Sequence, residues 1–183
     1  MEALEQDPLC RAEYFTVSVP RFLTYSLASF GLWPFYWVYR NWRAISKAGY
    51  KKKFSPLVRT VFFYATAYSL LQKILVGAKR LGYSGHYNPS LLAVLLFILG
   101  AISRVAGKLP EIMPEATRWA VLVSLAVIVL EPFLFVPPVK AVQFVTAQQG
   151  RELKANNKLT VGQMVIFAVG LLAWIGTFFP GGK

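Results

Sequence analysis

Apolar residues along this chain collect into long stretches instead of alternating with polar ones, and this pattern predicts helices that lie in a membrane. An α-helix rises about 1.5 Å per residue, so about 20 apolar residues cross a hydrocarbon core of about 30 Å. We therefore predict an all-α, polytopic integral membrane protein. Its helical bundle has three to five membrane-embedded segments, which are 22–42, 57–76, 91–106, 119–136 and 161–179.

The rest of the chain sets the domain organisation. Residues 1–20 are predicted to be a polar amino-terminal tail, and 21–183 a single membrane domain. Two prolines within 108–114 predict a tight turn, so the third and fourth segments are expected to form a helical hairpin that Pro137-Pro138 ends. Residues 139–158 mix valines with Gln, Lys and Arg, a pattern typical of a helix at the membrane surface.

The first two segments are atypical for simple crossings. The run 22–42 contains Pro34 and seven aromatic residues between Phe30 and Trp42, and Tyr and Trp favour the headgroup boundary. The clean apolar core of 57–76 is only 60–71, which spans about 18 Å as a helix. These features are typical of segments that enter the membrane and return to the same side.

Charge leaves two topologies open. The loops 43–59 and 138–158 are both basic, and basic loops favour the cytoplasm. If all five segments cross, these loops face opposite sides. If the first two segments are re-entrant, both loops face the cytoplasm.

Composition excludes several classes of function. Hydrophobic residues form 56% of the 183 and charged ones 15%, against about 25% charged in soluble domains. The net charge of +12 comes mostly from residues at segment ends, so we expect membrane lipids rather than nucleic acid as partners. Cys10, His86 and Asp7 are each the only residue of their type, which argues against a disulfide, a zinc site or paired-aspartate chemistry. We therefore predict no enzyme activity, no cofactor and no metal.

Glu131 is the one acidic residue within an apolar run. A carboxylate at the bilayer centre costs about 2.5 to 3.5 kcal/mol, so it should be paired or protonated. One interpretation is a proton or ion site beside Pro132, with Arg104. The other is an ion pair with Arg104, Arg59 or Lys73 that only fixes the packing of helices.

A second candidate site is an anchor for anionic lipid or for the membrane interface. Guanidinium groups bind phosphate through two hydrogen bonds, and indoles lie at the same depth. Ordinary anchoring by an aromatic belt explains the same residues. They are Trp37, Arg40, Asn41, Trp42, Arg43 and Arg59.

Small residues recur in the last segment at Gly170, Ala173 and Gly176, and such residues let another helix approach closely. We expect a structural or accessory subunit that packs on lipids and on other membrane proteins, either in a larger complex or in a homo-oligomer. The alternative is a small proton, ion or solute transporter that uses Glu131.

An ordered set of motifs resembles a family of small bacterial inner-membrane proteins of unassigned function, with the signature V-S-x-x-[KR]-F … G-L-[YW]-x-x-Y-W-x-Y-[KR]-N-W. The chain departs from it at Trp33, where Tyr is usual, and at Gln143 and Thr146, where Asn is frequent. The resemblance implies a multi-pass protein of the bacterial inner membrane and lends no catalytic residue. Its motifs are Tyr14-Phe15-Thr16-Val17-Ser18, Arg21-Phe22, Gly31-Leu32-Trp33, Tyr36-Trp37, Tyr39-Arg40-Asn41-Trp42, Pro56, Arg59, Leu109-Pro110, Pro137-Pro138-Val139 and 170–174.

Overall fold

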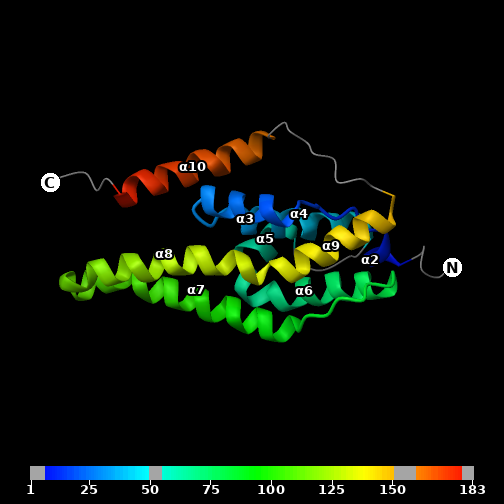
Figure 1. Cartoon of the computed structure of the whole chain (residues 1–183), viewed down its shortest axis with the longest axis horizontal. Helices are drawn as coiled ribbons and strands as arrows, with labels where there is room; N and C mark the ends of the chain where they lie inside the picture. Colours follow the sequence, from blue (N-terminus) through cyan, green and yellow to red (C-terminus); the bar gives the residue numbers. More distant parts are fainter. Residues whose placement is uncertain (1–6, 50–54, 151–159, 179–183) are drawn as a thin grey trace.

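The computed structural model describes residues 7–49, 55–150 and 160–178, and within these ranges the chain is helical and contains no strand. The predicted all-α class is therefore confirmed. The helices, labelled in Figure 1, are α2 (Pro8–Arg11), α3 (Val19–Ala28), α4 (Trp33–Lys47), α5 (Pro56–Val61), α6 (Phe63–Arg80), α7 (Pro89–Ile112), the 3-10 turn η1 (Pro114–Ala116), α8 (Thr117–Leu134), α9 (Val136–Gln148) and α10 (Val161–Phe178).

The expected segment 22–42 consists of two helices, α3 and α4, with a break between them. Phe30 and Gly31 have φ of 54° and 78°, a left-handed conformation that ends a right-handed helix. Pro34 stands in the first turn of α4, where its missing N–H costs no helical hydrogen bond. The chain doubles back here, because the Phe22 ring lies 5.9 Å from the Trp37 ring.

The second expected segment, 57–76, is also divided, into α5 and α6. The break falls at Phe62, and it leaves the Arg59 carbonyl to accept a 2.6 Å hydrogen bond from the Thr66 hydroxyl. Leu57 and Val61 on α5 are 62% and 71% exposed, whereas α6 buries one face against its neighbours.

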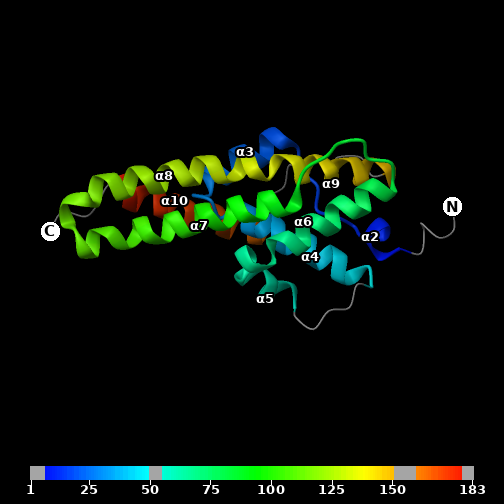
Figure 2. The same cartoon turned by 90° about the horizontal axis from the view of Figure 1, so that it is seen from below.

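The hairpin predicted from the third and fourth segments is α7 and α8, which run side by side and extend beyond α4, α5 and α6 at one end of the molecule (Figures 1 and 2). The helix α7 is longer than the expected 91–106. Asn88 caps its start by accepting hydrogen bonds from the N–H groups of Ser90 and Leu91. Pro110 lies within the last turn of α7 instead of in the loop, and it removes one hydrogen bond from that turn because proline has no N–H to donate.

The prolines after the fourth segment begin a helix instead of ending one. Helix α8 ends at Leu134, and Pro137 and Pro138 fall in the first turn of α9, where prolines fit. The predicted surface helix 139–158 is α9 only as far as Gln148, and α9 packs along α6. Residues 151–158 of that prediction lie outside the described part of the chain.

Aromatic side chains form the centre of the core. Trp33 and Trp37 are fully buried, and Trp42 is 1% exposed. The ring of Phe135 at the α8–α9 junction packs between those of Phe22 and Phe63, at 5.7 Å from each. The aromatic run expected at the membrane interface therefore joins α3, α4, α6 and α9 into one packed block.

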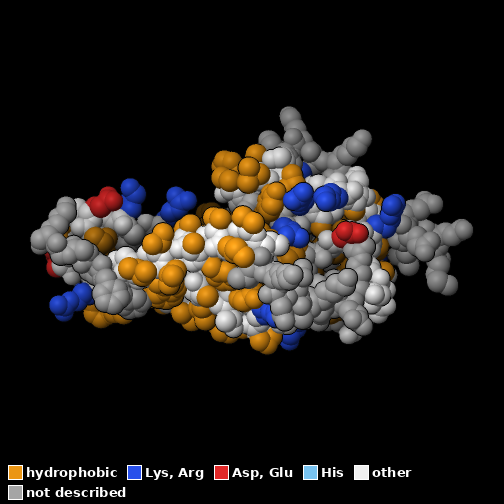
Figure 3. Space-filling model, turned by 90° about the horizontal axis from the view of Figure 1, so that it is seen from above, with side chains coloured by type: hydrophobic (Ala, Val, Ile, Leu, Met, Phe, Trp, Pro, Cys, Tyr) orange, Lys and Arg blue, Asp and Glu red, His pale blue; other side chains and the backbone are white. Residues whose placement is uncertain are grey.

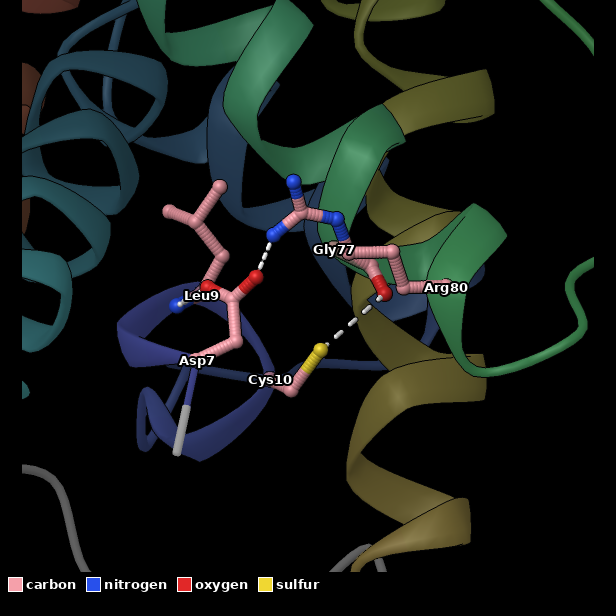
Figure 4. Close-up of polar contacts among 5 residues, drawn as sticks. All are labelled: Asp7, Leu9, Cys10, Gly77 and Arg80. Carbon is pink, nitrogen blue, oxygen red and sulfur yellow. Dashed lines mark hydrogen bonds and ion pairs between the residues drawn. The ribbon is translucent and has the colours of Figure 1, made fainter. Parts of the chain in front are cut away.

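The amino-terminal segment contributes to this block and differs from the polar tail expected over 1–20. Figure 4 shows how α2 rests against the end of α6. Asp7 forms an ion pair with Arg80, and the Cys10 thiol lies 4.0 Å from the Gly77 carbonyl oxygen. A Cβ at Gly77 would meet the Leu9 carbonyl oxygen at 3.2 Å, so a larger residue there would have to displace α2 by a few tenths of an ångström.

The remaining surface is strongly apolar. Two stretches, Pro89–Ile112 and Pro114–Gln148, are long and apolar enough to cross a membrane, and in their most apolar parts only 22% and 28% of the residues are buried. Helix α10 is a shorter apolar helix with most of its length exposed. Figure 3 shows hydrophobic side chains over the middle of the elongated molecule, with charged side chains gathered mainly toward its two ends.

Candidate functional site

Glu131 lies where α6, α7 and α8 meet, and its side chain is the most unusual polar group of the molecule. It is 7% exposed although it belongs to an apolar helix. The Tyr64 hydroxyl of α6 donates a hydrogen bond of 3.5 Å to its Oε1 atom. The Tyr64 ring is seated over Gly100 of α7, where a Cβ would come within 2.6 Å of the ring. The close packing of the Tyr64 ring on Gly100 therefore places the Tyr64 hydroxyl beside the Glu131 carboxylate.

The expected ion pairs of Glu131 are not among those of the described residues. Neither Arg104, Arg59 nor Lys73 provides a nitrogen within 4.0 Å of the carboxylate there. Arg104 is exposed on α7 and lines an open groove of about 700 Å³ together with Tyr64 and Lys108. Tyr64 lines this groove and Glu131 does not. The Tyr64 side chain therefore lies between the groove and the Glu131 carboxylate.

The six residues of the predicted lipid anchor separate into a buried group and an accessible one. Trp37 and Trp42 belong to the core, and Arg59 is 5% exposed with its guanidinium carbon 4.5 Å from the centre of the Trp42 ring. Asn41 is fully buried. Arg43 is exposed and Arg40 is half-buried, so only these two are available to a ligand from solution.

Asn41 joins the amino-terminal segment to α4. Its Oδ1 atom accepts a 3.0 Å hydrogen bond from the Phe15 N–H, and its Nδ2 atom donates to the Trp37 carbonyl at 2.9 Å. A buried amide that satisfies two backbone groups has little capacity left for a ligand. These contacts give Asn41 a structural role.

The three small residues of α10 lie in different surroundings. Gly170 is buried against α3, and a Cβ there would come within 2.5 Å of the Ser29 backbone. Ala173 is half-buried, and nothing lies within 4 Å of a Cβ built on Gly176. The Trp174 indole N–H donates a 3.0 Å hydrogen bond to the Leu27 carbonyl, which also holds α10 on α3. Gly170 therefore serves packing within this chain, and Gly176 is open to a neighbour.

Two buried side chains of the amino-terminal segment, a thiol and a phenol, are held in their neutral forms. Burial raises the pKa of the Cys10 thiol, and it raises the pKa of Tyr14 as well. Both side chains lie in the contact between this segment and α6, where a charged form would be poorly solvated. Neither has the features of an activated nucleophile.

Two residues of the Glu131 cluster, Tyr64 and Gly100, were not among the site residues predicted from the sequence. Tyr64 and Gly100 lie 67 and 31 positions from Glu131, and only the folded chain brings them together. A glycine within an apolar run was the one available clue, because it permits close contact.

Across the described ranges, no three His, Cys, Asp or Glu residues come together as a metal site would require. Comparisons of the chain with protein-family models, with curated proteins and with solved structures gave no match. The class defined by the fold is therefore an all-α protein with two helices long and apolar enough to cross a membrane.

Proposed function

We propose that the protein is a non-catalytic, multi-pass protein of the bacterial inner membrane that serves as a structural or accessory subunit. The observation that carries this proposal is the exposed apolar surface of α7, α8 and α10. Large side chains there are open to the surroundings, among them Val105 at 64%, Trp119 at 70% and Leu172 at 68%. Contiguous apolar surface on this scale is covered by lipid or by a partner.

In the proposed arrangement α7, α8 and α10 cross the bilayer, and α3 and α4 enter and return to one side. The antiparallel packing of α3 on α4, with Phe22 against Trp37 and Tyr25 against Trp33, supports the re-entrant topology. At the tip of the α7–α8 hairpin, Lys108, Glu111 and Arg118 are exposed, and these charged groups suit the opposite headgroup region. In this arrangement only α7 and α8 cross between the basic loops 43–59 and 138–158, so both loops face the same side.

The accessory role follows from what the exposed helices offer. The outer face of α10 carries Gly176 in open space beside exposed leucines and valines. A small residue on an apolar face permits close van der Waals contact with another helix, the main attraction between helices in lipid. A larger membrane protein or a second copy of this chain fits that face.

The direct test places a photo-crosslinking residue at Leu172 of α10, with a second at Lys79 on the charged end of α6 as control. Both positions are exposed. The proposal predicts crosslinks to one defined polypeptide from Leu172 and not from Lys79 after gentle detergent extraction. Crosslinks to lipid alone, on a particle containing one 20.5 kDa chain, would contradict the accessory role.

The transporter alternative rests on the burial of Glu131 beside Tyr64. It predicts proton or ion flux in liposomes that the Glu131→Gln variant abolishes while folding is retained. The accessory role predicts no flux above empty liposomes with either protein.

A further inference from the structure

A pocket of about 490 Å³ lies between the amino-terminal segment and the last two turns of α4. Among the residues that the structure describes, four basic side chains line it, Arg11 from α2 and Arg40, Arg43 and Lys47 from α4, and Glu13 is the one acidic side chain. Figure 3 shows Lys and Arg side chains gathered around an acidic one at the end of the molecule away from the hairpin tip. The sequence places these residues far apart, and the pocket forms because the amino-terminal segment folds back on α4.

The charge of the pocket favours an anion. The carboxyl end of α4 contributes a partial negative charge of about half a unit. Four cations against this partial charge and one carboxylate leave a clearly positive cavity. A solvated basic surface has similar charge, but it lacks a concave wall and a fixed donor, both of which are present here.

Arg40 is the fixed donor. Its Nη1 atom donates a 2.7 Å hydrogen bond to the Tyr36 hydroxyl, and its guanidinium carbon lies 4.6 Å from the centre of the Phe15 ring. The two aromatic residues hold the guanidinium at the pocket wall, with N–H groups beyond the one bonded to Tyr36. A planar guanidinium fork matches two oxygens of a phosphate group.

The pocket also lies close to the start of α10. The Tyr36 hydroxyl is 3.5 Å from the Thr160 hydroxyl, and Thr160 directly precedes α10. If α10 crosses the membrane from Val161, then Tyr36 and Arg40 lie at the depth of the lipid headgroups. Phosphodiester groups of phospholipids occupy that depth.

We propose that this pocket binds a phosphate group, held by Arg40 and Arg43 with Arg11 and Lys47 around it. The chemistry fits the headgroup of an anionic phospholipid and equally a soluble phosphate. The lipid source rests on the proposed membrane location, whereas phosphate binding itself does not.

The test compares the Arg43→Gln/Lys47→Gln variant with a matched control, Lys79→Gln/Lys140→Gln. All four side chains are exposed, and each variant removes two positive charges. Wild type and variants are reconstituted in nanodiscs of equal phosphatidylcholine and phosphatidylglycerol, and the lipids retained by each protein are counted by native mass spectrometry. Each basic residue near anionic lipid contributes a factor of about five, so retained phosphatidylglycerol should fall at least about tenfold in the pocket variant. The control should retain the wild-type ratio.

A second arm titrates inorganic phosphate into the same proteins in zwitterionic detergent. A loss confined to the lipid arm assigns a headgroup, and a loss confined to the phosphate arm assigns a soluble ligand. Equal loss in both variants, or no loss in either arm, overturns the proposal. Alkaline carbonate extraction of the wild type reports separately on membrane residence, so a failure of the proposed function is distinguishable from a failure of the pocket.

Discussion

Two regions of this molecule are similarly apolar in sequence and opposite in their surroundings. In the aromatic block of α3, α4, α6 and α9, Trp37 is fully buried and Phe22 and Phe135 pack around it. On the α7–α8 hairpin, Trp119 is 70% exposed. The comparison teaches that a long apolar run does not by itself distinguish a helix that faces lipid from one that faces its own chain.

The physical difference is how much of each helix its neighbours cover. Eight of the 15 residues of α4 are buried, against three of the 24 residues of α7. Apolar area left in water costs about 25 cal/mol per Å². The exposed apolar side chains of the hairpin therefore favour a lipid or protein environment, whereas those of the block are covered within this chain.

The largest predicted effect is a difference in stability between two tryptophan substitutions, one in the block and one on the hairpin. Replacing Trp37 with Ala opens a cavity in the block and should lower the free energy of unfolding by about 3 to 5 kcal/mol. Replacing Trp119 with Ala removes an exposed ring, and its effect should stay within about 0.5 kcal/mol. Denaturant unfolding in mixed micelles measures both. Equal destabilisation by the two substitutions would contradict the difference in burial between the block and the hairpin.

A smaller effect is expected at α10, which packs on α3 at Gly170 and is exposed at Gly176. Gly170→Val forces a side chain against the Ser29 backbone and should cost about 1 to 3 kcal/mol by overpacking. Gly176→Val enters open space and should leave stability unchanged. The thermal unfolding midpoint of each variant is the measurement. A matched decrease at both positions would show that α10 is not docked on α3 through Gly170.

The smallest effect concerns the junction between block and hairpin. Tyr64→Phe removes the hydroxyl that donates to Glu131, and because that bond is long the cost should be at most about 1 kcal/mol. Tyr68→Phe, on the exposed face of α6, is the control and should have no effect. The unfolding curves of both variants test this prediction. A loss of stability above about 1 kcal/mol in Tyr64→Phe would contradict it and would show that the Tyr64–Glu131 hydrogen bond contributes more to stability.

The sequence predicted the ends of some helices well. The expected segment 161–179 corresponds to α10, and 119–136 is shifted by two residues from α8. Both helices are apolar around most of their surface, so hydropathy alone defines them. The break at Phe30 and Gly31 was missed because an aromatic residue in a left-handed conformation has no signal in an apolar pattern.

The candidate sites were harder to predict, because their residues meet only through the tertiary fold. Glu131 was singled out from its position in an apolar run, yet its partner Tyr64 lies on another helix. Arg40 and Arg43 were singled out from local composition, and Arg11 joins them only because the amino-terminal segment folds onto α4. Asn41 was assigned to a lipid anchor, but it holds that segment in place.

The central claim is that the exposed apolar faces of α7, α8 and α10 contact acyl chains. Nitroxide labels on cysteines at Val105, Leu122 and Leu171, with one at Lys79 as reference, test it in reconstituted bilayers. A Cys10→Ala background removes the native thiol, which is already buried. We predict that the three apolar positions relax strongly with oxygen and weakly with a water-soluble nickel chelate, and that Lys79 does the reverse. Nickel access at all four positions would contradict the account.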